Sequence, residues 1–468
     1  MMDSTLVASE NLIKAERWDF EYFSPEFLNT IQQINQSGWT VKRLEEIVIT
    51  LTDGQHGYLN HLSDGIPLIR TTNVFPNEIR LDNVRYISPE AHAEIKRSQL
   101  KPGDVLLVTI GVTLGVSAVV DDSIGEANIN QNLVKITTKA EVNPYYLSLF
   151  FNSRFGKIQT QVSAAKSVVP IVNYARLRKM LVPLPPRHIQ DRIAQIMQDV
   201  YHIHKEKIKT SQEMITNIDQ FILDTLGIKF ENSQKNKNFL VNIKQLKGSR
   251  FDVDFYSPKF DNLYTALRQC ENYQLFPLSQ LIKPLVNGAT PKGANYQTDG
   301  IPFFRIQNIT PEGIDFSDLC FIDNATHEKM RRSKTKPRDL LMTITGRVGT
   351  AAVIPKTIQE GNINQHIVIL RVKNDFLDIN YLEAIINSSA VKFQAEHRNT
   401  GTTRIALDYP AINSFLIPIP SFEVQQDIVK EINLRRTKAQ ILRFEADNLI
   451  IETKARVERM ILGEEEVT

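Results

Sequence analysis

Hydrophobic residues recur at steps of three and four along residues 187–226. The apolar positions are Ile189, Ile193, Ile196, Val200, Ile203, Ile215, Ile218, Phe221, Ile222 and Leu226. This spacing places them on one stripe of a helix. Pro185 and Pro186 precede the stretch and Gly227 follows it, and both residue types mark helix boundaries. We therefore predict a helix over Arg187–Leu226, about 60 Å long at 1.5 Å per residue.

A second stretch with the same periodicity lies near the end of the chain, over Phe422–Leu462. Its apolar positions are Val424, Ile428, Ile432, Ala439, Leu442, Ala446, Leu449, Val457 and Met460. A single apolar stripe cannot bury itself, so each long helix needs a partner of similar length. The two predicted helices match in length, and we expect them to pair antiparallel as a coiled coil.

The segments before the two helices repeat one another in sequence and order. The matching pairs are Trp18–Pro25 with Phe251–Pro258, Asp64–Asn73 with Asp299–Asn308, Lys101–Leu107 with Lys336–Met342, Asn128–Gln131 with Asn362–Gln365, and Val182–Pro185 with Ile417–Pro420. The spacing between copies varies only from 233 to 235 residues, so the chain contains two copies of one unit.

Local patterns inside each unit predict both strands and helices. Short Val-, Ile- and Leu-rich runs bounded by glycine are typical of strands. We predict strands over Leu44–Leu51, Leu106–Thr109, Ala118–Val120, Leu133–Thr137, Leu340–Ile344, Ala351–Ile354 and Ile367–Val372, and helices over Tyr145–Asn152 and Tyr381–Asn387. The predicted fold class is therefore α+β, with two repeated α/β units separated by two long antiparallel helices that form a coiled-coil spacer. The predicted division is a first unit at 1–186, a helix at 187–226, a connector at 227–250, a second unit at 251–421, a helix at 422–462 and a tail at 463–468.

Composition excludes several classes of protein. Of the 468 residues, 42% are hydrophobic and 23% charged, as in ordinary globular proteins. The net charge of +2 means that any phosphate-binding surface must be local. Cys270 and Cys320 cannot form a disulfide framework, which favours a cytoplasmic location. The uncharged run Val105–Val120 is short for a membrane span and has the composition of buried strands.

Two related but diverged units suit a partner with two separated sites, and DNA with two half-sites is such a partner. The copies differ after their first predicted strand, where one has Gln55 and His56 and the other Thr290 and Lys292. Side chains of these types on glycine-containing loops can reach base edges and phosphates. The alternative is that these residues only form polar turns.

Further candidate DNA contacts are repeated in both units. Arg70 with Asn73 corresponds to Arg305 with Asn308. A structural role for the arginines, pairing with Asp64 and Asp299 or with a turn carbonyl, is the alternative to DNA contact. Late in each unit, small residues lie beside cations. This pattern suits a backbone that approaches phosphate, and the alternative is a plain loop. These late residues are Lys166, Ser167, Thr402, Thr403 and Arg404. The most basic run, Arg331–Lys336, is either a solvated face or a phosphate contact.

The order of these elements, present twice, resembles the DNA-specificity subunit of type I restriction–modification systems. The resemblance rests on the two-unit layout, the Asp-Leu-Leu strand, the Asn-Ile-Asn-Gln element, and the Pro-x-Pro entry with glutamine into a long helix. It covers about Asn11–Leu462. The chain departs from the family at His188, where glutamate is usual before the glutamine, while Glu423 keeps the pattern.

The resemblance implies that each unit is a target-recognition domain for one half of a bipartite, gapped sequence in double-stranded DNA. It also implies that the helices set the gap and dock two methyltransferase subunits, and that restriction and translocase subunits complete the complex. S-adenosylmethionine and ATP would then bind to those partners, and this chain would bind no cofactor or metal and have no catalytic residue.

Two alternative functions remain open from the sequence. A self-contained DNA methyltransferase is suggested by Asn143–Tyr146, which is similar to the Asn-Pro-Pro-Tyr loop of amino-methyltransferases. The second proline is missing, no glycine-rich cofactor loop follows a strand, and there is no P-loop for ATP. A coiled-coil adaptor without DNA contact is the other alternative, but an adaptor has little use for repeated globular units with diverged loops.

Overall fold

The computed structural model describes residues 20–54, 57, 60–165, 170–230, 253–291, 296–399 and 405–467. The chain forms two compact units. Unit 1 comprises Met1–Lys207 with Phe444–Thr468, and unit 2 comprises Ile208–Arg443. Each unit therefore combines one globular copy with part of each long helix.

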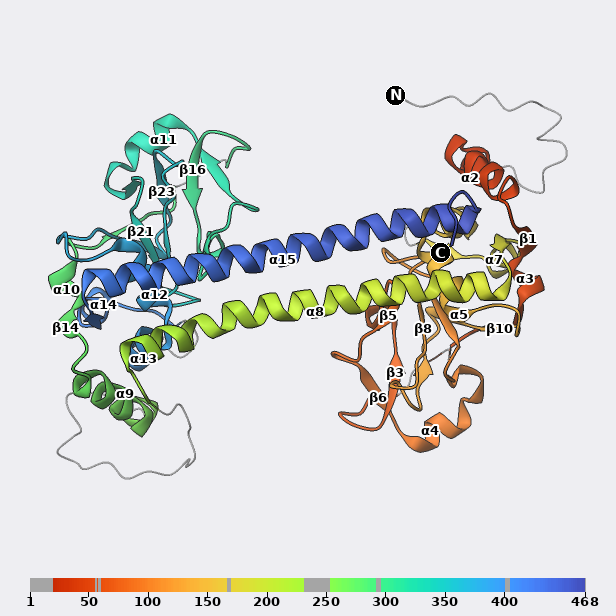
Figure 1. The fold of residues 1–468 in the computed structure, drawn as a ribbon, viewed down its shortest axis with the longest axis horizontal. Coiled ribbons are helices and arrows are strands. Elements are labelled where there is room, and N and C mark those ends of the chain that lie inside the picture. The colour runs from red at the N-terminus through yellow and green to blue at the C-terminus, as the bar shows by residue number, and fades with distance from the viewer. Residues whose placement is uncertain are drawn as a thin grey trace. The chain divides into compact units, whose positions relative to one another are not determined.

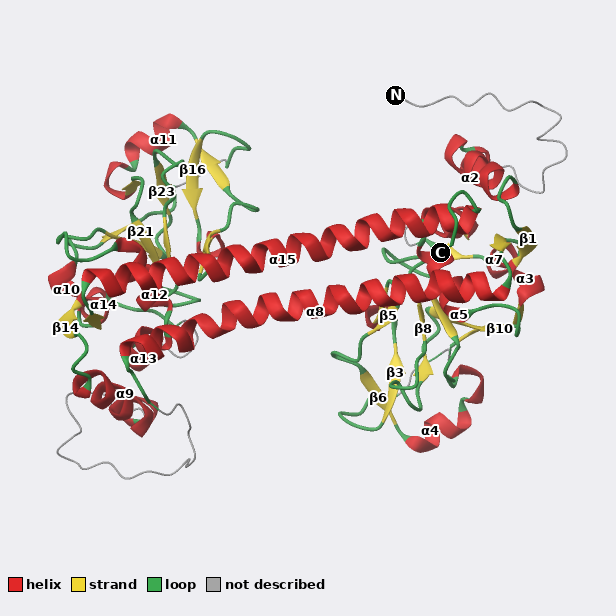
Figure 2. Cartoon of the chain, in the orientation of Figure 1, coloured by secondary structure: helices red, strands yellow, loops and turns green. Residues whose placement is uncertain are grey.

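The two long helices have the predicted bounds. Helix α8 spans Arg187–Leu226 and α15 spans Phe422–Leu462, and both are unbroken (Figure 2). Gly227 and Gly463 follow them with φ of 72° and 74°. This left-handed conformation ends a helix and favours glycine.

Within each unit the two helices contact one another in antiparallel order. In unit 1, His204 Nε2 lies 3.3 Å from Asp447 Oδ1, and Lys207 Nζ lies 2.6 Å from Glu445 Oε2. In unit 2, the buried Ser211 Oγ donates to the carbonyl of Ala439 at 3.0 Å. The antiparallel pairing predicted from the two apolar stripes is confirmed inside each unit.

Apart from the long helices, unit 1 consists of short strands and helices, which are numbered along the chain (Figure 1). Its strands are β1 Thr40–Arg43, β2 Val48–Asp53, β3 Ile66–Ile69, β4 Val74–Phe75, β5 Glu78–Ile79, β6 Arg85–Ile87, β7 Val105–Val108, β8 Ser117–Val119, β9 Asn128–Ile129, β10 Leu133–Thr138, β11 Ala164–Ala165, β12 Ile171–Val172 and β13 Leu181–Leu184. Its other helices are η1 Phe20–Phe23, α2 Pro25–Asn35, α3 Leu44–Ile47, η2 Thr71–Asn73, α4 Pro89–Glu94, η3 Lys96–Ser98, α5 Pro144–Asn152, α6 Arg154–Ser163 and α7 Tyr174–Arg178.

Unit 2 repeats most of this order. Its strands are β14 Gln274–Pro277, β15 Val286–Asn287, β16 Ile301–Phe304, β17 Ile309–Thr310, β18 Gly313–Ile314, β19 Cys320–Ile322, β20 Lys334–Thr335, β21 Leu340–Thr343, β22 Ala351–Val353, β23 Gly361–Ile363, β24 Ile367–Leu370 and β25 Leu416–Ile419. Its other helices are η5 Val253–Tyr256, α9 Pro258–Gln269, α10 Leu278–Leu281, η6 Ile306–Asn308, α11 Asn324–Lys329, η7 Arg331–Ser333, α12 Ile379–Asn387, α13 Ser389–Arg398 and α14 Tyr409–Asn413.

A four-stranded antiparallel sheet lies at the centre of each unit. Its order is β2-β10-β7-β8 in unit 1 and β15-β24-β21-β22 in unit 2. A second sheet, β6-β3-β9 in unit 1 and β19-β16-β23-β20 in unit 2, contains one parallel pair. The predicted strands over Leu106–Thr109 and Leu133–Thr137 correspond to β7 and β10.

Both faces of the central sheet are buried, which explains the continuous apolar runs in its strands. In unit 1, Val105 and Leu107 pack in one cluster with Phe150 of α5 and Met460 of α15. Leu106 and Val108 point to the opposite face and pack with Ile69 and other residues of the second sheet. Each fully buried side chain of this kind contributes roughly 1.5–3 kcal/mol to stability. The globular unit is thereby joined to the helices through a shared core.

The prediction of a strand over Leu44–Leu51 is wrong for the first half of this stretch. Residues Leu44–Ile47 form the short helix α3, and strand β2 begins only at Val48. The carboxylate of Glu46 accepts a hydrogen bond from the backbone N–H of Arg43 at 2.6 Å and so closes the helical turn. This local side-chain contact overrides the apolar alternation that suggested a strand.

Candidate nucleic-acid interface

One end of the central sheet gathers three loops in each unit. Neighbouring strands of an antiparallel sheet run in opposite directions, so the end of β2, the start of β10, the end of β7 and the start of β8 lie together. The loops there are the segment after Asp53, the turn at 130–132, and the hairpin between β7 and β8. In unit 2 they are the segment after Asn287, the turn at 364–366, and the hairpin between β21 and β22. We call this region the sheet-end surface of each unit.

A glycine joins the first two loops by backbone contact. A Cβ atom on Gly54 would lie 2.2 Å from the carbonyl oxygen of Asn130, and one on Gly288 would lie 2.0 Å from that of Ile363. Any side chain at these positions would clash with main chain that cannot move independently. The N–H of Gly288 also donates to the carbonyl of Ile367 at 3.2 Å. Glycine is therefore required for the loop to reach the turn.

The turn itself presents a glutamine to solvent. Asn130 Oδ1 accepts from the N–H of Asn132 at 3.3 Å in unit 1. Asn364 Oδ1 accepts from the N–H of His366 at 3.1 Å in unit 2. These bonds close the turns and leave the residue between them, Gln131 or Gln365, exposed. The sequence identified the Asn-Ile-Asn-Gln element only as a repeat marker, and its exposed glutamine was missed as a candidate.

The structure places Thr290, one of the candidate DNA contacts, on the sheet-end surface. Its hydroxyl donates to Gln365 Oε1, and Gln365 Nε2 lies 3.1 Å from Nε2 of His366. The three side chains therefore form a connected polar group next to the turn. Hydroxyl, amide and imidazole groups are all able to bond base edges.

A histidine paired with a buried asparagine holds a basic turn beside each sheet end. His92 Nδ1 contacts Asn128 Oδ1 in unit 1, and His327 Nδ1 contacts Asn362 Oδ1 in unit 2. The amide nitrogen of Asn128 donates to the Ser98 hydroxyl at 2.8 Å. These contacts fix η3 and η7, which carry the paired cations Lys96 with Arg97 and Arg331 with Arg332.

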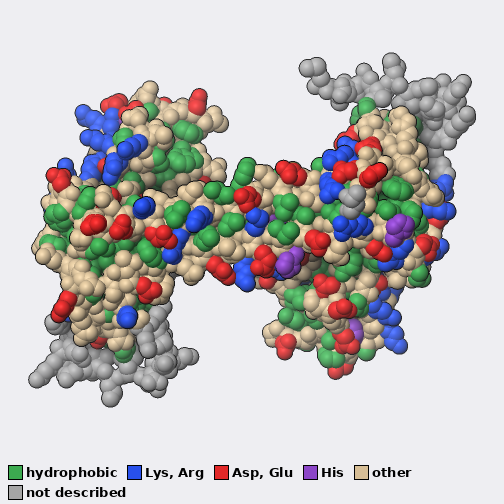
Figure 3. Space-filling view, viewed as in Figure 1, with side chains coloured by type: hydrophobic (Ala, Val, Ile, Leu, Met, Phe, Trp, Pro, Cys, Tyr) green, Lys and Arg blue, Asp and Glu red, His purple; other side chains and the backbone are tan. Residues whose placement is uncertain are grey.

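The basic turns differ in charge between the two units. Arg97 forms an ion pair with Asp53, whereas Arg332 Nη2 donates to the neutral amide of Asn287 at 3.4 Å. The carboxylate of Asp53 offsets the charge of Arg97 in unit 1. The amide of Asn287 carries no charge and does not offset that of Arg332 in unit 2. Figure 3 shows Lys and Arg side chains gathered on unit 2 beside α11. The arginine of this contact is therefore neutralised by an acid in unit 1 but not in unit 2.

Two of the predicted contacts, Asn73 and Asn308, are structural. Each is 1% exposed. Asn73 Nδ2 donates to the carbonyl of Arg80 at 3.0 Å, and Asn308 Nδ2 donates to that of Asp315 at 3.0 Å. Their side-chain oxygens accept from the N–H of Arg70 and Arg305 at 3.1 and 2.9 Å. The interpretation of these asparagines as DNA contacts is corrected, since their polar atoms are used inside the unit.

Arg70 and Arg305 lie at the margin of the sheet-end surface. The carbonyl of Ile69, just before Arg70, accepts from the N–H of Asn130 at 3.2 Å. Arg70 Nη2 donates to the carbonyl of Asn83 at 3.0 Å, and Arg305 Nη2 donates to that of Asp318 at 2.8 Å. These contacts match the turn-carbonyl alternative, with Asn83 and Asp318 as partners instead of Asp64 and Asp299.

Burial lowers the pKa of Arg70, and the nearby positive charge of Arg85 lowers it further. Burial and the charges of Arg85 and Arg70 likewise lower the pKa of His61. Burial is the larger cause in both cases and the like charges add to it, and a bound anion would oppose the shift that the like charges produce. A small cluster of positive charge therefore borders the turn in unit 1.

The remaining predicted contacts lie outside the described residues. They are Gln55, His56, Lys166, Ser167, Lys292, Thr402, Thr403 and Arg404. The described residues beside these segments belong to the sheet end. Gly54 packs on the turn, Ile171 forms a bridge with Ile110, and Ala406 forms a bridge with Thr345.

The segment Asn143–Tyr146 serves the fold. Asn143 Oδ1 accepts from the N–H of Tyr145 at 2.8 Å and caps α5. Tyr146 is fully buried, and its hydroxyl donates to the carbonyl of Pro183 at 2.7 Å. Tyr381 makes the same contact to Pro418 in unit 2. A base-binding pocket at Asn143–Tyr146 is incompatible with this packing.

The described residues also bear on two other classes of function. No group of three or more His, Cys, Asp or Glu side chains within them is placed to hold a metal ion. Every helix in those ranges is too short or too polar to span a bilayer.

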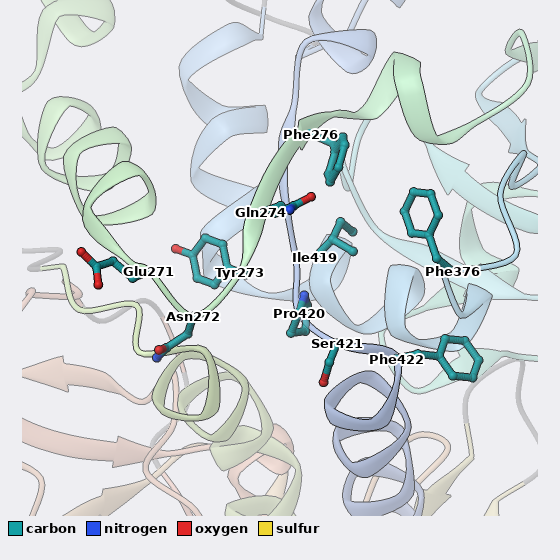
Figure 4. Close-up of a pocket in the computed structure, with 10 residues that line it drawn as sticks. All are labelled: Glu271, Asn272, Tyr273, Gln274, Phe276, Phe376, Ile419, Pro420, Ser421 and Phe422. Atoms are coloured by element: carbon teal, nitrogen blue, oxygen red, sulfur yellow. The ribbon is translucent and has the colours of Figure 1, made fainter.

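A hollow of about 500 Å³ lies in unit 2 where β14 and β25 meet the start of α15. Figure 4 shows the rings of Phe276, Phe376 and Phe422 on one side of it and Glu271 and Tyr273 on the other. Its lining is partly aromatic and partly polar, has Glu271 as its one charged residue, and contains no residue of the sheet-end surface.

The corresponding positions of unit 1 are polar. Lys42 matches Phe276 in strand register, and Arg187 matches Phe422 as the first residue of its long helix. Glu141 matches Phe376 because its carbonyl accepts from Gln190 Nε2 as that of Phe376 accepts from Gln425 Nε2. The aromatic hollow therefore distinguishes unit 2 from its copy.

Comparison with known proteins places this arrangement in a family. A solved chain from a study of the complex assembly and conformational transition of the type I R-M system has a TM-score of 0.55. It is 15% identical and covers 92% of this chain and 98% of its own, which shows a shared fold. The chain is 22% identical over 415 residues to the type I restriction enzyme EcoBI specificity subunit of Escherichia coli, covering 86% of this chain and 80% of that protein.

A second relative is the putative type I restriction enzyme MjaX specificity subunit of Methanocaldococcus jannaschii. It is 21% identical over 439 residues, which cover 91% of this chain and 92% of the relative. The family model described as the type I restriction modification DNA specificity domain matches residues 36–217 and 270–433. These two segments make up more than half of the chain, and the chain therefore belongs to the family of type I restriction–modification DNA-specificity subunits.

Proposed function

We propose that each unit recognises one half of a bipartite, gapped sequence in double-stranded DNA through its sheet-end surface. The observation that carries this proposal is the repeated sheet end. The same glycine contact and the same closed turn with its exposed glutamine recur in both units, while the next residue differs, Asn132 in one and His366 in the other, as recognition of two different half-sites requires. Exposed glutamine, threonine and arginine side chains on fixed loops provide base and phosphate contacts.

Electrostatics support DNA as the ligand. Arg331 and Lys336 are exposed, and Arg332 faces a neutral partner. Phosphate contacts by such residues release counterions and strengthen binding without regard to sequence. The overall net charge is only +2, so the attraction to phosphate in this proposal comes from local positive charge and not from the chain as a whole.

The long helices provide a spacer and a docking surface in this proposal. Large apolar side chains of α15 remain exposed in each unit, with Phe444 67% and Ile451 64% exposed in unit 1, and Leu434 46% and Ile441 50% exposed in unit 2. Exposed apolar residues along a helix suit a protein partner. We assign this role to methyltransferase subunits, two per chain, with restriction and translocase subunits completing a cytoplasmic complex. S-adenosylmethionine, ATP and catalysis belong to those partners in the proposal.

The proposal is tested by mapping methylated sites in cells that carry this chain with its methyltransferase partner. The expected result is a two-part motif with a fixed gap that disappears when this chain is deleted. Methylation without a motif that depends on this chain would refute the proposal and favour an adaptor function.

The spacer role has its own test. Four residues are inserted into α8 beside Ser211 and four into α15 beside Ala439, where the two helices touch. Four helical residues add about 6 Å. This length equals about two base pairs at 3.4 Å each. The gap is expected to lengthen by about two base pairs while both half-sites stay the same. Altered half-sites with an unchanged gap would contradict the spacer role.

A further inference from the structure

The hairpin at the sheet end carries an exposed side chain at the same position of each unit, directly after its first glycine. In unit 1 the hairpin turns at Gly111–Gly115, and Val112 between them is fully exposed, at 106% of its reference area. In unit 2 it turns at Gly346–Gly349, and Arg347 is exposed. All four glycines have φ between 72° and 87°, where side chains are disfavoured.

The backbone of both hairpins is fixed. In unit 1 the N–H of Val108 donates to the carbonyl of Val116 at 2.8 Å, and the N–H of Gly115 donates back to Val108 at 2.9 Å. In unit 2 the N–H groups of Thr343 and Gly349 donate to the carbonyls of Thr350 and Thr343, both at 2.9 Å. The tip side chains therefore project from an ordered frame.

Each tip lies beside the glutamine turn of its unit. The N–H of Thr109 donates to the carbonyl of Asn132 at 3.2 Å, three residues before Val112. The N–H of Ile344 donates to the carbonyl of His366 at 2.9 Å, three residues before Arg347. The tip and the exposed glutamine thus belong to one surface.

Neither tip side chain has a role in its fold. Val112 packs on nothing that removes it from water. Within the described residues, no hydrogen bond or ion pair engages the guanidinium of Arg347. A single exposed valine is ordinary on a protein surface. Here, however, the valine lies at the tip of a fixed hairpin, and the matching tip of unit 2 carries an arginine. The two recognition surfaces therefore also differ at this position.

We propose that Val112 and Arg347 each determine the base pair at one position of their half-sites, an inference that rests on the proposed DNA-recognition function. A two-stranded ribbon fits the major groove, where thymine presents a methyl group and guanine presents O6 and N7. Val112 contacts a thymine methyl, so the half-site of unit 1 contains an A·T pair at this position. Arg347 donates two hydrogen bonds to guanine, so the half-site of unit 2 contains a G·C pair.

The test uses the full chain with its methyltransferase partner and compares methylated motifs for wild type, Val112→Ala and Arg347→Ala. The control is Lys356→Ala, since Lys356 is also an exposed cation of unit 2 but follows β22 at its far end. Loss of a bidentate contact to guanine is expected to reduce discrimination at one position by roughly 5- to 150-fold. Arg347→Ala should therefore relax one position of one half-site only. Val112→Ala should relax one A·T position of the other half-site, and Lys356→Ala should change neither.

The outcomes separate this inference from the function on which it rests. A wild-type chain without a gapped motif would overturn both. A gapped wild-type motif that Arg347→Ala leaves unchanged would overturn the guanine contact alone. If Arg347→Ala weakened methylation at all sites equally and reduced its salt dependence, Arg347 would contact phosphate, and the proposed guanine contact would again be overturned. Thermal unfolding of each variant is expected to match wild type, since both tips are exposed.

Discussion

Replacement of Arg436 by methionine is expected to destabilise unit 2 in a pH-dependent manner. Arg436 of α15 donates through Nη2 to Glu383 Oε1 of α12 at 3.2 Å and to the carbonyl of Pro311 at 2.5 Å. The side chain of Glu383 is 7% exposed and that of Arg436 19% exposed. The pair therefore joins the globular part of unit 2 to the long helix in a largely dry environment.

The magnitude follows from leaving the carboxylate buried without its cation. Removing one partner of a buried ion pair costs about 3–5 kcal/mol, and the partial exposure of Arg436 favours the lower end, about 3 kcal/mol. Burial already raises the pKa of Glu383 above its ordinary value, and Arg436 opposes this rise. Methionine removes the opposing charge, so the pKa rises further.

The sign of the pH dependence is then fixed. A carboxyl group with a raised pKa binds its proton more tightly in the folded chain, so its contribution to stability falls as pH rises through the folded pKa. In the variant the pKa of Glu383 is higher, so the free energy of unfolding continues to fall to higher pH, by up to about 1.4 kcal/mol per pH unit. The deficit of Arg436→Met relative to wild type is therefore expected to be small near pH 4.5 and close to its full size at pH 8.

Urea unfolding at pH 5 and pH 8, with hydrogen exchange of α12 as a probe specific to unit 2, measures this deficit. The corresponding residue in unit 1, Tyr201, provides a control without charge, because its hydroxyl accepts from Asn77 Nδ2 at 3.0 Å. Tyr201→Phe should cost about 1 kcal/mol at both pH values. The double variant Arg436→Met with Glu383→Met should recover most of the loss. A deficit of equal size at pH 5 and pH 8 would refute the reasoning.

Three further changes test other features. Gly288→Ala places a Cβ 2.0 Å from the carbonyl oxygen of Ile363. It should displace the loop and weaken binding of the half-site of unit 2 in mobility-shift assays, and unchanged affinity would contradict the role of the loop. Gln425→Ala removes three hydrogen bonds of 2.9–3.0 Å from a fully buried side chain. It should cost about 3 kcal/mol in chemical denaturation, and a loss below about 1 kcal/mol would count against this estimate. Arg331→Ala should lower the slope of log K against log salt by about one without changing the recognised sequence, and an altered motif would instead indicate a base contact.

The long helices could be predicted from sequence because their information is local. Periodic apolar residues, prolines before the first turn and a glycine after the last define Arg187–Leu226 without knowledge of any distant contact. Strand β7 could be located for the same reason, since its residues are uniformly apolar. The short helix α3 could not, because a single bond from Glu46 to the backbone of Arg43 decided it.

The roles of polar residues depended on tertiary contacts and were harder to predict. Asn73 and Gln131 have similar side chains, and sequence alone favoured Asn73 because it accompanies a repeated arginine. The fold buries Asn73 and exposes Gln131. The only sequence signal for Gln131 is that it follows an asparagine able to close a turn, which is too common to be specific. The exposed valine at position 112 gave no signal, because it lies inside an apolar run.

The contact through Gly54 and Gly288 has an evolutionary consequence. It holds each loop to its turn through main-chain atoms, so it does not depend on the identity of any neighbouring side chain. Substitutions at the exposed positions around it leave the core and its hydrogen bonds intact and cost little stability. A lineage can therefore acquire a new DNA target by successive point substitutions at these positions without passing through an unfolded or aggregation-prone intermediate.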